Sequence, residues 1–440
     1  MELYEHQSNA LKETEGKNHV AYYHDMGLGK TFTGAEKMMQ LDAKVNLVIC
    51  QKSKVDDWVE HFKKYYFNDC VIVLDLTDKK QFKQFFTVDF RYGCPVIGVI
   101  NYELAFRRPE LTKLEDFTLM LDESSLIQNE NSKRSRFILK KLKPKNVILL
   151  SGTPTGGKYE RLWSQLNLLG WNISKKLFYN QYVDYHYEDN EGFPLMIIDG
   201  YKNEERLKKK MRQHGCNFLK TDDVFDLPEQ IHQTIKVNTT KEYRKFRKDC
   251  ITQFDLVDYV GYECGGEEEY TRSIELVGDT TLTKMLYERQ LCGQYNKTKL
   301  GAFRDLVEST NDRLIVFYNF TEELEALCKI AWDSNRPVAV VNGKQKDLLP
   351  YENVETSITF IQYQAGAMGL NLQKANKIIY FTPPLSSELF EQSKKRIHRI
   401  GQEKPCFYYY LTCKGSIEEK IYRTLAMRKD YTDALFEEGE

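Results

Sequence analysis

Short apolar runs separated by helical stretches restrict the fold of this 440-residue chain more than any other feature. Five runs fall within the first 150 residues and five more follow residue 300: Val45–Cys50, Val71–Leu74, Val96–Ile100, Phe117–Leu121 and Val147–Leu150, then Leu314–Tyr318, Val338–Val341, Ile358–Ile361, Ile378–Phe381 and Phe407–Leu411. Strands that are apolar throughout and alternate with helices are typical of parallel sheets covered on both faces. The sequence therefore predicts an α/β fold with two parallel sheets flanked by helices.

A different pattern separates the two groups of strands. From Trp171 to Leu300 the chain is helical, basic and aromatic in character, so we expect mainly helical insertions and a linker. Within it, Gly261–Glu269 joins glycines to an acidic run and predicts a mobile loop. The expected organisation is a first domain at 1–172, a helical insertion at 173–228, a helical linker and protrusion at 229–300, and a second domain at 301–440.

The composition excludes several classes of protein. Hydrophobic residues make up 41% and charged residues 29%, which rules out a mostly disordered chain, and no long apolar run suggests a membrane span. Met1–Gln7 lacks the features of a secretory signal, so we expect a cytoplasmic location. The ten cysteines show no C-x-x-C spacing, which argues against zinc and against a disulfide framework and favours small core residues. Because the net charge is −1, any nucleic-acid partner must be held by local basic patches.

A phosphate-binding loop is the strongest local motif. The apolar run Val20–Tyr23 is followed by Asp25 and then by Met26, Gly27, Leu28, Gly29, Lys30 and Thr31. A strand that ends in a glycine-containing turn and opens a helix directs backbone N–H groups at phosphates, while Lys30 reaches the β- and γ-phosphates and Thr31 ligates Mg²⁺. His24 stands where the strict pattern has a glycine. A tight turn with a chance lysine therefore remains open on this motif alone.

An acidic pair, Asp122 and Glu123, follows the run Phe117–Leu121. At the carboxyl end of a strand, Asp122 would hold Mg²⁺ through water and Glu123 would orient and deprotonate the attacking water. The alternative is an acidic pair that complements a helix dipole. The phosphate loop upstream favours the catalytic interpretation.

A basic run lies far downstream, from Gln392 to Gln402. Arg396 and Arg399 are three residues apart, so on a helix they share a face and could both reach a γ-phosphate bound to the other domain. This is the geometry of arginine fingers. A solvated basic face or a phosphate-backbone patch is the alternative for such a run taken by itself.

Together, and in this order, these motifs resemble the Swi/Snf-type DNA translocases of helicase superfamily two. In the first half of the chain, Tyr4–Gln7 is similar to that family's glutamine motif, Leu47–Trp58 to its first nucleic-acid motif and Leu150–Leu169 to its coupling motif. Further along, Leu227-Pro228 is similar to the start of the second lobe, Arg313–Phe320 to the fourth motif and Ala365–Leu372 to the fifth motif. The resemblance implies two RecA-like lobes, an ATP-binding lobe at 1–172 and a lobe with arginine fingers at 301–440.

The resemblance also implies roles for individual residues. Gln7 would hydrogen-bond adenine, Gly369 and Gln392 would bind ATP, and Arg396 and Arg399 would complete a site in which Lys30, Thr31, Asp122 and Glu123 bind and hydrolyse MgATP. The positions near the nucleic-acid path are Lys52, Ser53, Asn101, Tyr102, Asn319 and Gly366. Small polar residues at strand ends are, however, more often simple caps.

The function implied is an ATP-dependent translocase on double-stranded DNA. We expect a bare, monomeric motor core without a membrane partner, and the sequence identifies no protein partner. The expected origin is a bacterium, a virus or a mobile element. If a phage encodes the protein, its expected location is the cytoplasm of the host. An RNA helicase of the same superfamily and a nucleotide-gated scaffold or loader with little hydrolysis are the alternatives.

The chain departs from the family pattern at several positions. Ser124 and Ser125 follow the acidic pair where the family has Ala-His, so the coupling contact must come from Ser125 or from elsewhere. Gln51 replaces a proline, Ala367 replaces a glycine, and Phe381–Pro384 lacks an aspartate. These departures fall in motifs that the resemblance links to nucleic acid, so they weaken the prediction of nucleic-acid contacts and leave that of ATP binding unchanged.

Overall fold

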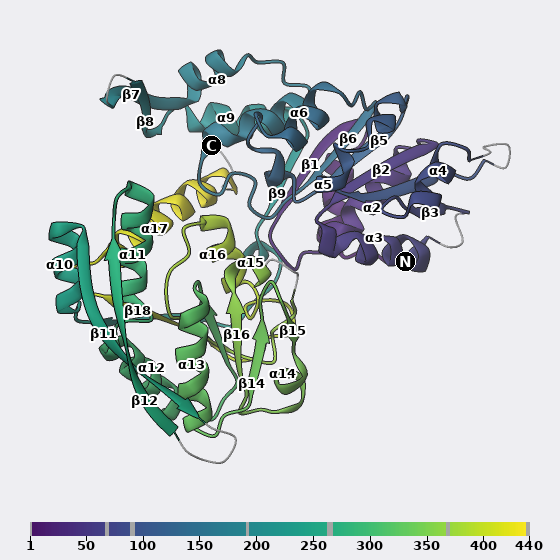
Figure 1. Cartoon of the computed structure of the whole chain (residues 1–440). Coiled ribbons are helices and arrows are strands. Elements are labelled where there is room, and N and C mark those ends of the chain that lie inside the picture. Colours follow the sequence, from purple (N-terminus) through teal and green to yellow (C-terminus); the bar gives the residue numbers. More distant parts are fainter. Residues whose placement is uncertain are drawn as a thin grey trace. The chain divides into compact units, whose positions relative to one another are not determined.

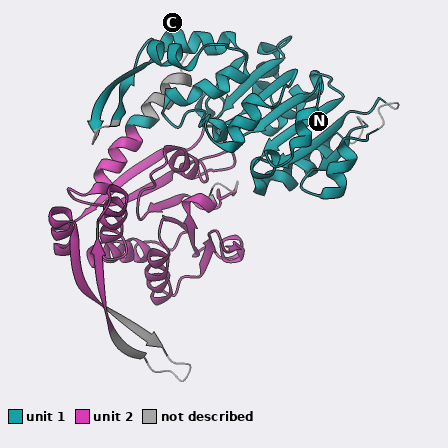
Figure 2. Ribbon diagram, turned by 45° about the horizontal axis from the view of Figure 1, so that its top comes forward, with its two compact units in different colours: residues 1–226, 427–440 teal, residues 227–426 magenta. Residues whose placement is uncertain are grey.

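The computed structural model describes residues 2–66, 70–88, 93–190, 193–261, 267–366 and 370–436. The chain divides into two compact units, shown in different colours in Figure 2. Unit 1 comprises residues 1–226 and 427–440, and unit 2 comprises residues 227–426. Each unit is built around one seven-stranded sheet.

The sheet of unit 1 is parallel throughout (Figure 1). Its strands are, in spatial order, β3 (Ile72–Asp75), β4 (Val96–Asn101), β2 (Val45–Cys50), β5 (Thr118–Asp122), β6 (Asn146–Leu150), β1 (His19–His24) and β9 (Cys216–Leu219). The five strands predicted for this part of the chain are confirmed to within two residues at each end.

Two apolar clusters cover the two faces of this sheet. Leu47 and Ile49 of β2 belong to one cluster, whereas Val48 and Cys50 belong to the other, because successive side chains of a strand point to opposite faces. One cluster receives α1 (Glu5–Glu13), α2 (Lys30–Gln40) and α3 (Val55–Tyr65); the other receives α4 (Lys79–Phe85), α5 (Tyr102–Ala105), α6 (Lys133–Lys140), α7 (Trp163–Leu168), α8 (Lys175–Tyr182) and α9 (Glu204–Gln213). Burial on both faces explains why the strands read as continuous apolar runs.

The sheet of unit 2 follows the same plan. Its strands are β10 (Gln230–Val237), β18 (Cys406–Cys413), β17 (Lys377–Tyr380), β13 (Leu314–Tyr318), β16 (Ile358–Gln362), β14 (Val338–Val341) and β15 (Lys346–Asp347), of which only β15 pairs antiparallel among the described residues. The remaining helices are α10 (Lys241–Asp249), α11 (Thr281–Cys292), α12 (Lys297–Glu308), α13 (Thr321–Asp333), α14 (Leu349–Asn353), α15 (Tyr363–Gly366), α16 (Ser387–Lys394) and α17 (Ile417–Phe436). The five strands predicted after residue 300 are confirmed.

The region between the two groups of strands contains helices α8 to α11, as expected, but also strands that the sequence analysis does not predict. Two antiparallel hairpins lie there: β7 (Val183–Asn190) pairs with β8 (Phe193–Tyr201), and β11 (Ile251–Gly261) pairs with β12 (Glu267–Val277). In the same region, β9 adds an edge strand to the sheet of unit 1 and β10 adds one to the sheet of unit 2. The expectation of a mainly helical region is therefore corrected. A hairpin pairs with its own neighbour, so it needs no continuous apolar run. Of the predicted mobile loop, residues 262–266 lie outside the described residues.

The cysteines largely follow expectation. Six of them are buried as small core residues: Cys50, Cys216, Cys292, Cys328, Cys406 and Cys413. Cys70 and Cys94, however, form a disulfide with their Cα atoms 5.3 Å apart. They precede β3 and β4, which pair in parallel, so strand pairing brings together two residues whose sequence spacing carries no such signal. Among the described residues, no helix is long and apolar enough to cross a membrane.

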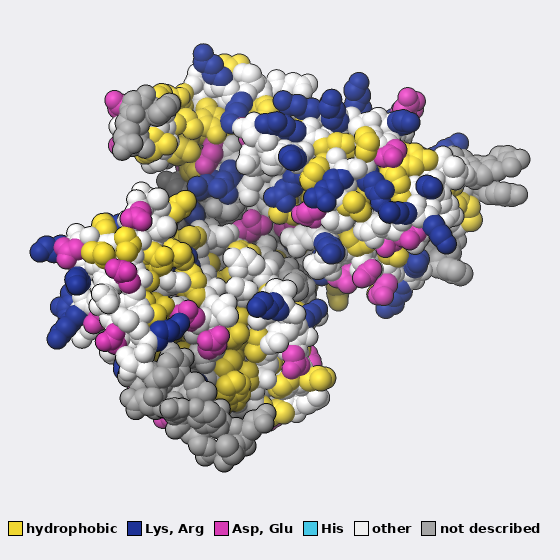
Figure 3. Space-filling model, in the orientation of Figure 1, with side chains coloured by type: hydrophobic (Ala, Val, Ile, Leu, Met, Phe, Trp, Pro, Cys, Tyr) yellow, Lys and Arg dark blue, Asp and Glu magenta, His cyan; other side chains and the backbone are white. Residues whose placement is uncertain are grey.

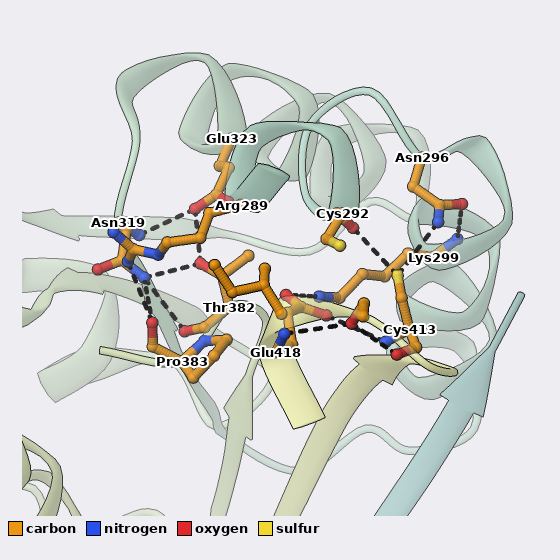
Figure 4. A network of polar contacts seen from close by, with 12 residues as sticks. Arg289, Cys292, Asn296, Lys299, Asn319, Glu323, Thr382, Pro383, Cys413 and Glu418 are labelled. Carbon is orange, nitrogen blue, oxygen red and sulfur yellow. Dashed lines mark hydrogen bonds and ion pairs between the residues drawn. The ribbon is translucent and has the colours of Figure 1, made fainter. Parts of the chain in front are cut away.

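A buried ion pair fixes the start of α17 in unit 2 (Figure 4). Lys299 Nζ of α12 lies 2.6 Å from Glu418 Oε1, and both side chains are fully buried. The backbone N–H of Cys413 donates to Glu418 Oε2 at 3.0 Å. Burial alone would lower the pKa of Lys299, but the Glu418 carboxylate outweighs it and the pKa is raised. The carboxylate therefore favours the charged form of Lys299.

Replacing Lys299 by Met should destabilise unit 2, because Glu418 would remain as a buried charge without its cation. We expect the free energy of unfolding to fall by about 3–5 kcal/mol in chemical denaturation followed by circular dichroism. The control is Lys374→Met, which breaks an ion pair with Glu352 whose side chains are about half exposed. That change should cost less than about 1 kcal/mol. Equal effects of the two substitutions would contradict the assignment.

Candidate functional site

The phosphate loop lies between a strand and a helix, as its motif requires. β1 ends at His24, the loop spans residues 25–29, and α2 begins at Lys30. Gly27 and Gly29 have φ angles of 93° and 71°, in the left-handed region that favours glycine. Lys30 Nζ donates to the carbonyl oxygens of His24 and Asp25 at 2.8 and 3.2 Å. The lysine is therefore folded across the loop, where a phosphate would be held.

His24, which replaces the first glycine of the motif, is a buried part of the scaffold. Its Nε2 lies 2.5 Å from Asn217 Oδ1 of β9, and burial lowers its pKa to about 3. The residue pairs within the sheet and is not among the positions with positive φ. A glycine is not required here, because the loop makes its left-handed turns only later, at Gly27 and Gly29.

The acidic pair lies at the same edge of the sheet. β5, β6 and β1 are neighbouring parallel strands, so Asp122, Ser151 and Asp25 all leave the sheet at the carboxyl edge. Ser151 Oγ donates to Glu123 Oε2 at 3.4 Å. A Cβ built on Gly152, the next residue, would lie 3.3 Å from Lys30 Nζ. The structure thus brings Lys30, Asp122, Glu123 and the coupling motif together.

Asp122 and Glu123 are held by specific contacts. Trp58 Nε1 donates to Asp122 Oδ2 at 2.9 Å. Burial raises the pKa of Asp122, while the Trp58 hydrogen bond and the charge of Lys30 act in the opposite direction. Glu123 has a φ of 53°, unusual for a residue with a side chain, and such strained positions cluster at functional sites. Thr31, at the start of α2, and Asp122 offer the oxygen ligands that suit Mg²⁺.

Gln165 is a residue that the sequence analysis missed. Its Oε1 accepts from Ser124 Oγ at 2.7 Å and from Tyr23 OH at 3.0 Å, and its Nε2 donates to the carbonyl oxygen of Pro154 at 2.7 Å. This fully buried amide links the acidic motif to the coupling motif. Ser124 therefore contacts the residue that reaches the coupling motif. No sequence pattern identifies a lone glutamine in α7, although its position within Leu150–Leu169 is consistent with coupling.

The Gln7 side chain hydrogen-bonds the backbone of the phosphate loop. Its Oε1 accepts from the Tyr4 backbone N–H at 3.0 Å, and its Nε2 donates to the Leu28 carbonyl at 3.2 Å. A cavity of about 1010 Å³ lies beside α1 and is lined by residues that include Tyr4, His6 and Phe225. Tyr4 and His6 stack on one another, and Phe225 meets both edge to face. His6, which lines this cavity, also hydrogen-bonds the Leu28 carbonyl oxygen of the loop through Nε2 at 3.0 Å.

The two arginines of unit 2 are placed differently from the expectation. α16 ends at Lys394, so Arg396 and Arg399 lie in the turns that follow and not on a helix face. The reason is tertiary: Gln402 Nε2 donates to the carbonyl oxygens of Gln373 and Ala375 at 3.1 and 2.9 Å, which draws the segment away from a helical path. Arg396 is buried, and Arg399 Nη1 donates to Asn371 Oδ1 at 2.5 Å.

Two further residues of the predicted ATP site also fall in this unit. Gln392 is buried within α16. Gly369 lies outside the described residues.

The predicted nucleic-acid residues divide into two groups. Lys52 and Ser53 are exposed in the turn after β2. In contrast, Tyr102 OH donates to the Asp122 carbonyl at 2.9 Å, Asn101 Nδ2 donates to Glu103 at 3.0 Å, and Asn319 Nδ2 donates to Thr382 Oγ1 at 2.8 Å (Figure 4). These three side chains make hydrogen bonds within their own unit. Gly366 is the last residue of α15.

Three side chains of unit 2 lie close enough together to be metal ligands, but an ion pair and hydrogen bonds explain their arrangement. Cys292, Cys413 and Glu418 place ligand atoms within 4.8 Å of one another. The Lys299 ammonium already neutralises Glu418, and Asn296 Nδ2 donates to Cys413 Sγ at 3.2 Å. This cluster is therefore a buried ion pair with polar neighbours.

Two family models match consecutive parts of the chain. The model of the SNF2-related domain matches residues 12–297, and the model of the helicase conserved C-terminal domain matches residues 298–401. A solved structure, the Sulfolobus solfataricus SWI2/SNF2 ATPase core in complex with dsDNA, aligns over 98% of this chain and 92% of that chain, with 19% identity and a TM-score of 0.44.

Curated relatives match along most of the chain. The ISWI chromatin-remodeling complex ATPase ISW2 of Saccharomyces cerevisiae is 23% identical over 94% of this chain and 39% of its own length. The DNA repair and recombination protein RAD54-like of Drosophila erecta is 24% identical over 94% of this chain and 60% of its own length. The chain thus spans about two to three fifths of these relatives. Because the SNF2-related model covers more than half of the residues and includes the whole phosphate loop, the chain belongs to the SNF2-related family.

Proposed function

We propose that this chain is an ATP-dependent translocase on double-stranded DNA. The observation that carries the proposal is the convergence of Lys30, Asp122, Glu123 and the coupling motif at one edge of a parallel sheet. Those residues suit a phosphoryl-transfer site, in which catalysis depends on positioning and on electrostatic stabilisation. Bound Mg²⁺ would bridge the phosphates and neutralise charge that develops on them. Thr31 and Asp122 are the residues that would hold it.

The chain's own residues have distinct roles in this proposal. Lys30 releases its two loop carbonyls and donates to the phosphates. Glu123, held by Ser151, orients a water for in-line attack and accepts its proton. Gln7 keeps the loop in shape, and the aromatic-lined cavity beside α1 offers room for a base. The Ser124–Gln165–Pro154 link then transmits a change at the acidic pair to the coupling motif.

The second lobe would complete the reaction. We assign Arg396 and Arg399 to stabilising charge on the transferred phosphoryl group, with Gln392 and Gly369 nearby. The lobes would correspond to residues 1–172 and 301–440, with the insertion and the linker between them. If closure of the lobes depends on the nucleotide, each turnover can move one lobe along a strand.

Local charge supports a nucleic-acid partner despite the net charge of −1. Lys and Arg side chains gather over α5 and α6 of unit 1 (Figure 3), and α6 and the residues after it are rich in them. Exposed Lys52 lies after β2, on the same edge as the acidic pair. Double-stranded DNA is the proposed partner because the relatives include chromatin-remodeling and DNA-repair proteins.

Duplex DNA should stimulate ATP turnover, since the site would be completed only on the substrate. The measurement is the steady-state ATPase rate without nucleic acid, with duplex DNA and with RNA, alongside displacement of a triplex strand from a duplex. Stimulation by RNA alone would favour an RNA helicase. Absence of turnover under every condition would favour a nucleotide-gated scaffold.

Replacing Lys30 by Ala should abolish ATP binding or hydrolysis, because the phosphates would lose their fixed cation. ATP affinity measured by calorimetry and the turnover rate together report the loss. Lys12→Ala, an exposed lysine of α1, is the matched control and should behave as wild type.

Replacing Arg399 by Ala should spare ATP binding and reduce turnover by ~10³ or more, as for the loss of an arginine finger. Arg423→Ala removes an exposed arginine of the same unit and should leave both quantities unchanged. Normal hydrolysis by the Arg399 variant would refute a site shared between the lobes.

A further inference from the structure

Helix α10 of unit 2 carries an exposed basic face that the candidate ATP site does not use. Tyr243 and Phe246 are the buried side chains of this helix. With about 3.6 residues per turn, the side opposite them is occupied by four exposed cations, which we name the basic face of α10: Lys241, Arg244, Lys245 and Lys248. Lys and Arg side chains project at the left edge in Figure 3, where Figure 1 places α10.

The other side of α10 is anchored within unit 2. The Thr240 hydroxyl caps the helix by accepting from the Tyr243 backbone N–H at 3.1 Å. Tyr243 OH in turn accepts from the Ile417 backbone N–H at 2.9 Å. The Phe246 ring meets the ring of Tyr287 in α11 edge to face. The basic face is therefore presented on a fixed support.

The basic face has no counter-charge paired with it among the described residues. No ion pair there includes any of its four side chains. Arg244 Nε donates to the backbone carbonyl oxygen of Thr240 at 3.4 Å, so its hydrogen bond is not to a carboxylate. Glu242 and Asp249, the acidic residues of the helix, lie together on one flank of the basic face.

Like charges repeat along this face. Lys241 and Lys245 are four residues apart, as are Arg244 and Lys248, so the members of each pair are neighbours on the helix surface. Like-charged pairs at this spacing destabilise a helix. Of the four cations, only Lys248 lies in the last turn, where a positive charge complements the helix dipole. The stability of α10 therefore does not explain the arrangement.

The spacing suits a phosphate backbone. Lys248 lies seven residues after Lys241, which corresponds to about 10 Å along the helix. One strand of duplex DNA carries a phosphate every ~3.4 Å of its axis, so this length matches roughly three phosphates. Lysine and arginine side chains offer only donors and positive charge, which suits phosphate oxygens.

We propose that the basic face of α10 binds the phosphate backbone of double-stranded DNA. This inference rests on the proposed function and adds a contact surface on unit 2 to it. Because the net charge of the chain is −1, a nucleic-acid partner depends on local basic surfaces of this kind. The contact is independent of DNA sequence, since phosphates carry no base information.

The test is the salt dependence of duplex binding by the full chain, measured by fluorescence anisotropy. Lys241→Gln combined with Lys245→Gln should reduce the slope of log affinity against log salt by about 1.8, which is about 0.9 for each lost phosphate contact. Affinity at about 0.1 M salt should fall roughly tenfold or more. Arg244→Lys keeps the charge and should keep the slope.

The matched control removes two exposed lysines from another surface of unit 2. Lys344→Gln combined with Lys346→Gln, between the end of β14 and the start of β15, changes the net charge equally and should keep the slope. In both double variants the melting temperature and the ATP turnover without DNA should equal those of wild type. The α10 variant alone should need more DNA for half-maximal stimulation and should reach the same maximal rate.

An unchanged slope in the α10 variant, with a wild type that duplex DNA binds and stimulates, would overturn this contact and leave the proposed function intact. An equal loss of slope in the control variant would also overturn it, because the effect would then be one of net charge. A lowered melting temperature with an unchanged slope would mean that the four cations serve only the fold of α10. A wild type that duplex DNA neither binds nor stimulates would overturn the proposed function itself.

Discussion

Parallel pairing of β1 with β6, and of β6 with β5, is the constraint on which the candidate site depends. Parallel strands end at one edge, so the phosphate loop, the acidic pair and the coupling motif emerge at the same edge, although they begin at residues 25, 122 and 150 of the chain. The strands are buried on both faces, which keeps their ends in fixed register. The packing that buries the strands therefore also places the candidate site residues at the strand ends.

Buried polar side chains connect this edge to its surroundings. Gln165 joins Ser124, the residue after the acidic pair, to Pro154 of the coupling motif. Trp58 donates to Asp122, and Gln7 donates to the Leu28 carbonyl of the phosphate loop. Each of these groups would be costly to bury alone, but each is hydrogen-bonded. These hydrogen bonds connect the candidate site to neighbouring parts of unit 1.

The two units share a seven-stranded, mainly parallel sheet but carry different functional candidates. Unit 1 carries the phosphate loop and acidic pair, whereas unit 2 fixes its arginines by tertiary hydrogen bonds from Gln402 and anchors α17 by the Lys299–Glu418 pair. α17 contains residues of both units.

The ten main strands, the phosphate loop and the acidic pair could be predicted from the sequence, because continuous apolar runs and strand-end motifs are local signals. The two hairpins, the Cys70–Cys94 bridge, the turn that carries Arg396 and Arg399, and the hydrogen bonds of Gln165 appear only in the folded chain. Each of these depends on partners that local sequence signals do not identify. Pairing between strands, or a side chain that hydrogen-bonds to another loop, leaves no periodic pattern, so sequence spacing could not reveal it.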